Sequence, residues 1–137
     1  MDGISEEIEV LARRTIGAAI EVHTVLGAGY LESVYQEAMQ VELARCDLPF
    51  RAEHSVRVDY KGERVGMGRL DLLVHDRLIV ELKAVEKVQP IHKAQVIQYL
   101  KVTELPLALL LNFKVRRMKD GIKRVALTKP RTDWRRR

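Results

Sequence analysis

The sequence predicts a mixed α/β fold in which helices and strands are layered around one sheet. Apolar residues recur at three- and four-residue steps in the first 45 positions and again over residues 90–103, which is the spacing of amphipathic helices. Between residues 50 and 85 the period changes to two, which is typical of strands. The predicted order is therefore two helices, a three-strand meander, a helix and two strands.

The first two elements are predicted to be helices over residues 5–26 and 31–45. Ser5 is a suitable N-cap, because its hydroxyl can accept a bond from a backbone N–H of the first turn. The glycines of Gly27-Ala28-Gly29 are expected to end the first helix. In the second helix we expect four apolar side chains to point inward, namely Leu31, Val34, Ala38 and Val41.

The remaining elements follow from alternation and from turn residues. Lys61-Gly62 predicts a tight turn between strands at 50–60 and 64–74, and residues 75–77 form the next turn. Pro90 is tolerated in a first helical turn, so it opens the predicted helix. The other expected elements are a strand at 78–85, a helix at 90–103, and strands at 107–112 and 123–128.

Length and composition favour one globular domain and exclude several classes of protein. The 137 residues are 47% hydrophobic and 31% charged, so we expect a single domain over residues 1–130 and a basic tail over 131–137. No apolar run approaches the roughly 20 residues of a membrane span. The acidic N-terminus does not resemble a signal peptide, and the single Cys46 excludes an internal disulfide. We therefore expect a cytoplasmic protein without a membrane segment.

Positive charge is concentrated in the last part of the chain. Lysines and arginines number 24 against 19 acidic residues, and the segment from Lys114 to the end carries 11 of the basic residues against only two acidic ones. Such a stretch attracts phosphate backbones, although an acidic protein partner or a merely solvated face would fit as well. The candidate nucleic-acid contacts are Arg69, Arg116, Arg117, Lys123 and Arg124.

Two acidic residues are predicted to face each other inside apolar strands. Glu81 and Lys83 lie on one face of their strand, because side chains alternate. If residues 75–77 form a three-residue loop, Asp71 lies opposite Glu81 with Cβ atoms about 4.5–5.5 Å apart. Two carboxylates at this short distance repel each other unless a proton or a cation lies between them. Such a pair would suit Mg²⁺, which takes carboxylate oxygens as ligands. A different loop length would separate them, and Glu81 and Lys83 would then form an ordinary ion pair on an edge strand.

Four segments together resemble the PD-(D/E)XK nuclease superfamily. Gly68-Arg69-Leu70-Asp71 and Glu81-Leu82-Lys83 resemble its acidic and E-x-K motifs, and Gln95–Tyr99 resembles the Q-x-x-x-Y helix motif of its RecB-like branch. Gly29–Tyr35 is similar to the signature of the bacterial GxxExxY family. The resemblance spans roughly residues 10–127. It implies a restriction-endonuclease-like core with a mixed central sheet and an extra N-terminal helix.

The resemblance also implies a nuclease that uses Mg²⁺ or Mn²⁺ to cut DNA, or less favourably RNA. Gln95 and Tyr99 share a helical face and could equally be its polar edge. Without the resemblance, Glu32 would only complement a helix dipole. Dimerisation would present two active sites to two strands, but the sequence does not establish it. The sequence also leaves open the alternative that the protein is a non-catalytic nucleic-acid-binding or protein-interaction module. The implied metal ligands are Asp71, Glu81 and Glu32, joined in catalysis by Lys83, Gln95 and Tyr99.

Overall fold

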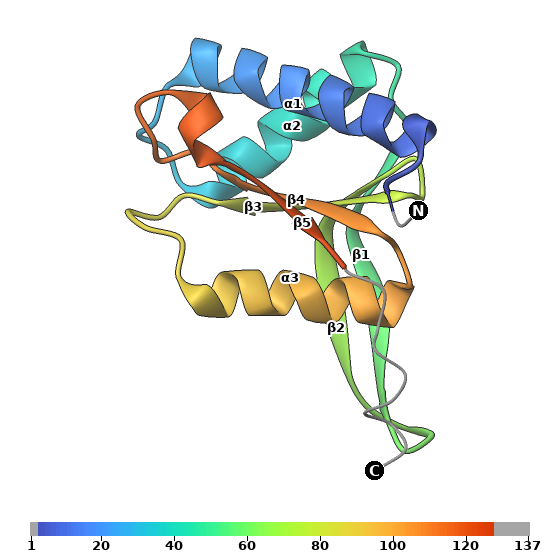
Figure 1. Ribbon diagram of the computed structural model, residues 1–137. Helices are drawn as coiled ribbons and strands as arrows, with labels where there is room; N and C mark the ends of the chain where they lie inside the picture. Colours follow the sequence, from blue (N-terminus) through green and yellow to red (C-terminus); the bar gives the residue numbers. More distant parts are fainter. Residues whose placement is uncertain (1–2, 128–137) are drawn as a thin grey trace.

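The protein is a three-layer α/β structure, described over residues 3–127 by a computed structural model. Helices α1 (Glu6–Leu26) and α2 (Glu32–Arg45) cover one face of a five-stranded sheet, and α3 (Pro90–Thr103) covers the other (Figure 1). The strand order is β1-β2-β3-β4-β5; β3 and β4 are parallel and the other neighbours are antiparallel. The strands are β1 (Phe50–Tyr60), β2 (Glu63–Val74), β3 (Leu78–Lys83), β4 (Leu107–Asn112) and β5 (Ile122–Ala126), with a short 3₁₀ helix, η1 (Met118–Gly121), before β5.

This architecture confirms the predicted α/β class and the predicted order of elements. It also agrees with the restriction-endonuclease-like core that the resemblance implied. The third strand ends two residues earlier than predicted, at Lys83, and the last begins one residue earlier, at Ile122. The basic tail expected over residues 131–137 lies outside the described residues. No helix in the described part of the chain is both long and apolar enough to cross a bilayer.

Helix α1 begins and ends where local chemistry favours it. The Ser5 hydroxyl accepts a bond from the N–H of Ile8, and three glutamates of the first turn complement the helix dipole. At the other end, Gly27 has a φ of 78° and its N–H bonds the carbonyl of His23. Glycine adopts this conformation without a steric penalty, so the chain turns directly into the segment that leads to α2.

The predicted inward face of α2 is wrong. Leu31 and Val41 are 76% and 60% exposed, and Val34 is exposed as well, whereas Ala38 is half-buried. The buried stripe consists instead of Tyr35, Met39 and Leu43, at four-residue steps. Because α2 carries apolar residues on two faces, its periodicity is compatible with either orientation. The structure buries the face with the larger side chains.

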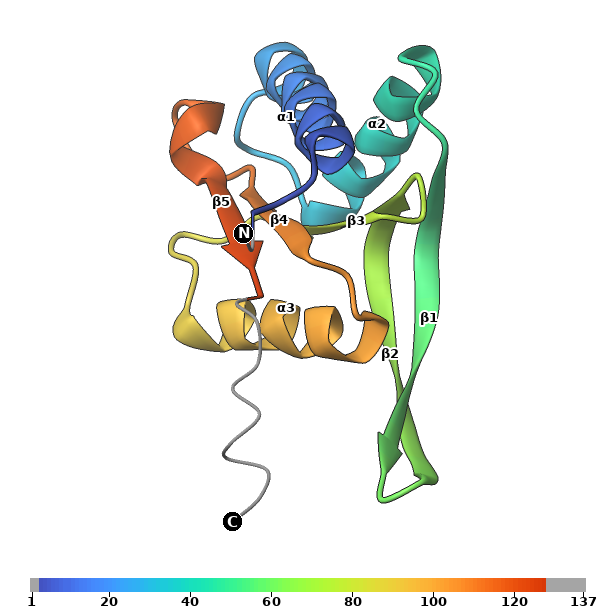
Figure 2. The same ribbon diagram turned by 45° about the vertical axis from the view of Figure 1, so that its right-hand side comes forward.

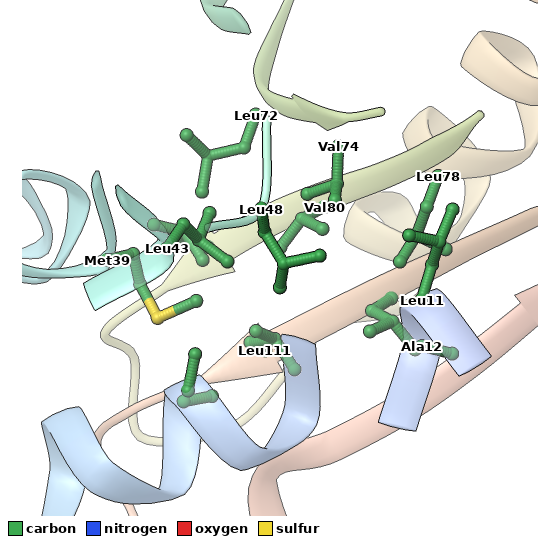
Figure 3. Close-up of a cluster of buried hydrophobic side chains, with 14 of the residues drawn as sticks. Leu11, Ala12, Met39, Leu43, Leu48, Leu72, Val74, Leu78, Val80 and Leu111 are labelled. Atoms are coloured by element: carbon green, nitrogen blue, oxygen red, sulfur yellow. The ribbon is translucent and has the colours of Figure 1, made fainter. Parts of the chain in front are cut away.

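A hydrophobic core lies on each side of the sheet. The larger one packs α1 and α2 against the sheet, and Figure 3 shows how side chains from both helices meet those of the strands. The smaller one packs Val96 and Leu100 of α3 against the other face. Residues labelled in Figure 3 are Leu11, Ala12, Met39, Leu43, Leu48, Leu72, Val74, Leu78, Val80 and Leu111.

The β1–β2 hairpin is longer than the body of the sheet. Its outer half projects past α3, as both ribbon views show (Figure 1, Figure 2). The predicted turn at Lys61-Gly62 is present, with positive φ at both residues, and connects the paired Tyr60 and Glu63. At its inner end β2 pairs with β3 in the predicted register, with Val74 opposite Leu78 and Leu72 opposite Val80.

Candidate active site

Asp71 and Glu81 meet where β2 and β3 separate. The pairing of these two strands ends at Leu72 and Val80, one residue before the two acids. Beyond that point each acid bonds the main chain of the opposite strand. The Asp71 N–H donates to Glu81 Oε2 at 2.7 Å, and the Leu82 N–H donates to Asp71 Oδ2 at 2.8 Å. The two carboxylates thus replace the ladder, and each keeps one oxygen outside these bonds.

Burial makes both carboxylates reluctant to ionise. Glu81 is only 4% exposed, and burial, reinforced by the negative charge of Asp71, raises its pKa to about 8. Burial also raises the pKa of Asp71, against the opposing effects of the Leu82 N–H bond and the positive charge of Lys83. A cation between the two carboxylates would offset this cost by favouring their charged forms.

Lys83 and Glu32 lie within electrostatic range of this pair. Lys83 is half-buried at the end of β3, and its charge lowers the pKa of Asp71, Glu81 and Glu32. Glu32 is the first residue of α2 and is exposed at the rim. Partial desolvation is the main cause that raises its pKa, and the charge of Asp71 acts in the same direction. The structure therefore gathers four of the predicted residues into one electrostatic cluster.

Gln95 and Tyr99 belong to α3 and reach β2 on the face of the sheet opposite α1 and α2. The Gln95 amide donates to the Tyr99 hydroxyl at 3.4 Å, and the same oxygen accepts a long bond from the Arg69 N–H. Close contact with β2 requires glycine at position 68, because an added Cβ would lie 2.7 Å from the Tyr99 ring. The helix motif is thus adjacent to the segment that leads into Asp71.

Comparison with known families identifies the fold and the broad activity. A family model described as the PD-(D/E)XK nuclease superfamily matches residues 9–125, which is most of the chain. This chain belongs to the PD-(D/E)XK nuclease superfamily. Membership supports a nuclease acting on a nucleic acid, and PD-(D/E)XK nucleases typically use divalent metals. A search of curated proteins found no match.

The donor set fits the divalent metal of a PD-(D/E)XK nuclease through two side chains. Hard cations such as Mg²⁺ and Mn²⁺ take carboxylate oxygens and retain several waters. The reciprocal bonds leave one oxygen on Asp71 and one on Glu81 available for such an ion. Among residues 3–127, no group of three or more acidic, histidine or cysteine side chains is arranged to hold a metal. Glu32 therefore does not complete a three-carboxylate ligand set in this structure.

The arginines and the lysine predicted to bind nucleic acid are spread over the molecule. Arg69 lies two residues before Asp71 on β2 and forms an ion pair of 3.1 Å with Glu53. Arg124 is held by Glu9 of α1 through two bonds. Arg116 and Arg117 line a groove of about 520 Å³ between the end of α1 and the segment before β5. Arg117 also forms an ion pair with Asp120. Lys123 is exposed on β5. The structure does not bring these five cations together.

Sequence reasoning missed the buried residues that support this PD-(D/E)XK site. The Tyr35 hydroxyl bonds the carbonyl of Gly27 and accepts from the Tyr30 N–H, which fixes the segment before Glu32. The Tyr35 ring stacks on Phe113 with centroids 4.6 Å apart. The Phe113 N–H bonds the Lys83 carbonyl.

Asn112 supports the chain directly after Lys83. Its side-chain oxygen accepts from the Val85 N–H and its amide donates to the Val85 carbonyl. These two bonds replace strand pairing and explain why β3 ends at Lys83. Asn112 gave no signal in the sequence, whereas Tyr35 was visible only as the last position of the GxxExxY-like segment.

Proposed function

We propose that this protein is a Mg²⁺-dependent nuclease that hydrolyses phosphodiester bonds of DNA, with RNA as the less favoured substrate. The observation that carries the proposal is the reciprocal pair of Asp71 and Glu81, with the Lys83 ammonium group close by. A nearly buried carboxylate beside a second one is expensive in a metal-free protein. This cost is accounted for if the pair binds a cation during function.

The side chains of the cluster divide the work of such a reaction. Asp71 and Glu81 would hold Mg²⁺ or Mn²⁺, which, when bound, polarises a phosphate oxygen and lowers the pKa of a water. Lys83 faces the same side as Glu81, so its ammonium group can orient the attacking water or stabilise negative charge on the phosphate. Glu32, at the rim, would position a further water. The resemblance of Gly29–Tyr35 to the GxxExxY family remains a prediction.

Gln95 and Tyr99 have a supporting part in this proposal. The Tyr99 hydroxyl lies between the Gln95 amide and the main chain of Arg69, two residues before Asp71. From there both polar groups can donate to a phosphate that approaches Asp71. They would orient the nucleic acid rather than transfer a proton.

Cleavage assays on purified variants test the proposal. Wild type, Asp71→Asn and Lys83→Ala are incubated with linear, nicked, branched and single-stranded DNA, and with RNA, in Mg²⁺ or Mn²⁺. Lys101→Ala on α3 is the control for removal of an exposed lysine. We expect cleavage by wild type and Lys101→Ala and a loss of at least about 100-fold in the other two. Absence of cleavage by wild type, or equal cleavage by all four, contradicts the proposal.

Nucleic-acid binding without cleavage is the second candidate function. It is favoured by the groove that Arg116, Arg117 and Lys119 line, because no acidic side chain lines it. Binding through this groove predicts an affinity that falls steeply with salt and is unchanged in Glu81→Gln. Arg116→Ala should then weaken binding and reduce the salt slope, and the same comparison after removal of residues 131–137 measures the share of the tail. A salt slope that neither change alters excludes these residues as the contact surface.

A further inference from the structure

We infer that Gln36 of α2 is a positioning residue that holds Asp71 in the orientation needed for the acidic pair. The effect of Gln36 on activity rests on the proposed nuclease function, whereas its effect on the position of Asp71 does not depend on that function. Gln36 lies one turn after Glu32, so both side chains leave the same face of the helix. The Gln36 amide Nε2 donates to the backbone carbonyl of Asp71 at 2.8 Å.

Asp71 needs such support because strand pairing is interrupted around it. On one side, the pairing of β2 with β3 stops at Leu72. On the other side, pairing of β1 with β2 skips from Ala52–Leu72 to His54–Leu70. Glu53, which lies opposite Asp71, has a φ of 51°, a conformation that residues other than glycine seldom adopt. Strand β2 is therefore irregular at the residue that the proposed site needs placed most accurately.

Three hydrogen bonds that involve side chains replace the missing strand pairing at Asp71. The Asp71 N–H is bonded by the Glu81 carboxylate, and the Asp71 carboxylate is bonded by the Leu82 N–H. The Asp71 carbonyl is bonded by Gln36. Because these bonds engage the N–H, the carbonyl and the side chain of one residue, they restrict its φ, ψ and χ angles together. Gln36 supplies the only one of the three that does not involve β3.

The direction of the bond is fixed by chemistry. The partner on Asp71 is a carbonyl oxygen, which only accepts, so the Gln36 amide nitrogen must face it. A methionine at position 36 would have nearly the same length and helix propensity but could not donate. Without the donor, the Asp71 peptide can rotate away from Glu81, and the two carboxylates no longer share one spot.

The test compares Gln36→Met with Gln40→Met, which lies one turn further along α2 and is also half-buried. In metal-free protein, amide hydrogen exchange is measured at Asp71 and Leu82. We expect exchange at these two amides about tenfold faster in Gln36→Met than in Gln40→Met, with a urea midpoint lowered by no more than the loss of one hydrogen bond explains. In cleavage assays we expect kcat to fall by about 10- to 100-fold and KM to change by less than about twofold.

The outcomes separate this inference from the proposed function. If wild type cleaves no substrate, the proposed function fails and amide exchange alone decides the role of Gln36. Equal exchange at Asp71 and Leu82 in the two variants overturns the inference. An effect on KM alone also overturns it, because Gln36 would then contact substrate instead of positioning Asp71. A uniform loss of stability in Gln36→Met with no local change at Asp71 does the same.

Discussion

The buried carboxylate of Glu81 should make the metal-free protein less stable as the pH rises. In the folded protein the pKa of Glu81 is about 8, whereas the ordinary value is 4.5. Between these values the folded state binds more protons than the unfolded state, so the free energy of unfolding decreases with increasing pH. At about 1.4 kcal/mol per pKa unit, the free energy of unfolding falls by roughly 5 kcal/mol in total between low and high pH. Most of this stability is present at pH 5 and absent at pH 9.

Glu81→Gln removes the ionisation and keeps the shape. The glutamine carbonyl can still accept the Asp71 N–H bond that Glu81 Oε2 accepts. We therefore expect similar unfolding free energies for variant and wild type at pH 5, and a variant that is several kcal/mol more stable at pH 9. Glu37→Gln, an exposed position on α2, controls for the loss of one negative charge.

Urea unfolding followed by circular dichroism, in EDTA at pH 5, 7 and 9, measures this difference. Adding Mg²⁺ at pH 9 should restore stability to wild type but not to Glu81→Gln, because a bound cation favours the ionised pair. The reasoning is refuted if wild type and Glu81→Gln show parallel pH profiles. It is also refuted if the variant is the less stable protein at pH 9.

Three further substitutions test the packing around the site. Gly68→Ala should cost about 1–3 kcal/mol in urea unfolding, because the new methyl group displaces Tyr99, and an unchanged midpoint would contradict this contact. Asn112→Ala should cost about 1–3 kcal/mol because it leaves the main chain after β3 without its two bonds; a smaller effect than that of an exposed control would contradict this role. Tyr35→Phe should lower the free energy of unfolding by about 1 kcal/mol, because it keeps the stack on Phe113 and loses only the hydroxyl bonds. A loss above about 3 kcal/mol would contradict this, because two hydrogen bonds do not account for it.

The acidic pair could be predicted because its signals are local. Loop length and alternation fixed the register of β2 and β3, and the structure confirms that register as far as Leu72 and Val80. What alternation could not predict is that the ladder stops there and that Asp71 and Glu81 bond the main chains across the gap. That arrangement depends on how two strands diverge in three dimensions, which no periodicity encodes.

The support of the site could not be predicted because its contacts are distant in sequence. Gln36 and Asp71 are 35 residues apart, and Asn112 and Val85 are 27 residues apart. An amide side chain in a helix or at a strand end is usually a surface residue, so neither position stood out. The predicted orientation of α2 was wrong for a related reason. Either apolar face of the helix has helical spacing, and only packing against the sheet selects the face that carries Tyr35.

A calorimetric titration of the metal-free protein with Mg²⁺ tests most directly whether the two carboxylates form one cation site. Wild type at pH 8 should bind Mg²⁺ and release protons, because binding requires the ionised form of a group whose pKa is about 8. Asp71→Asn and Glu81→Gln should each lose most of this binding, while Glu37→Gln should bind as wild type does. Undiminished binding by both site variants would contradict the account.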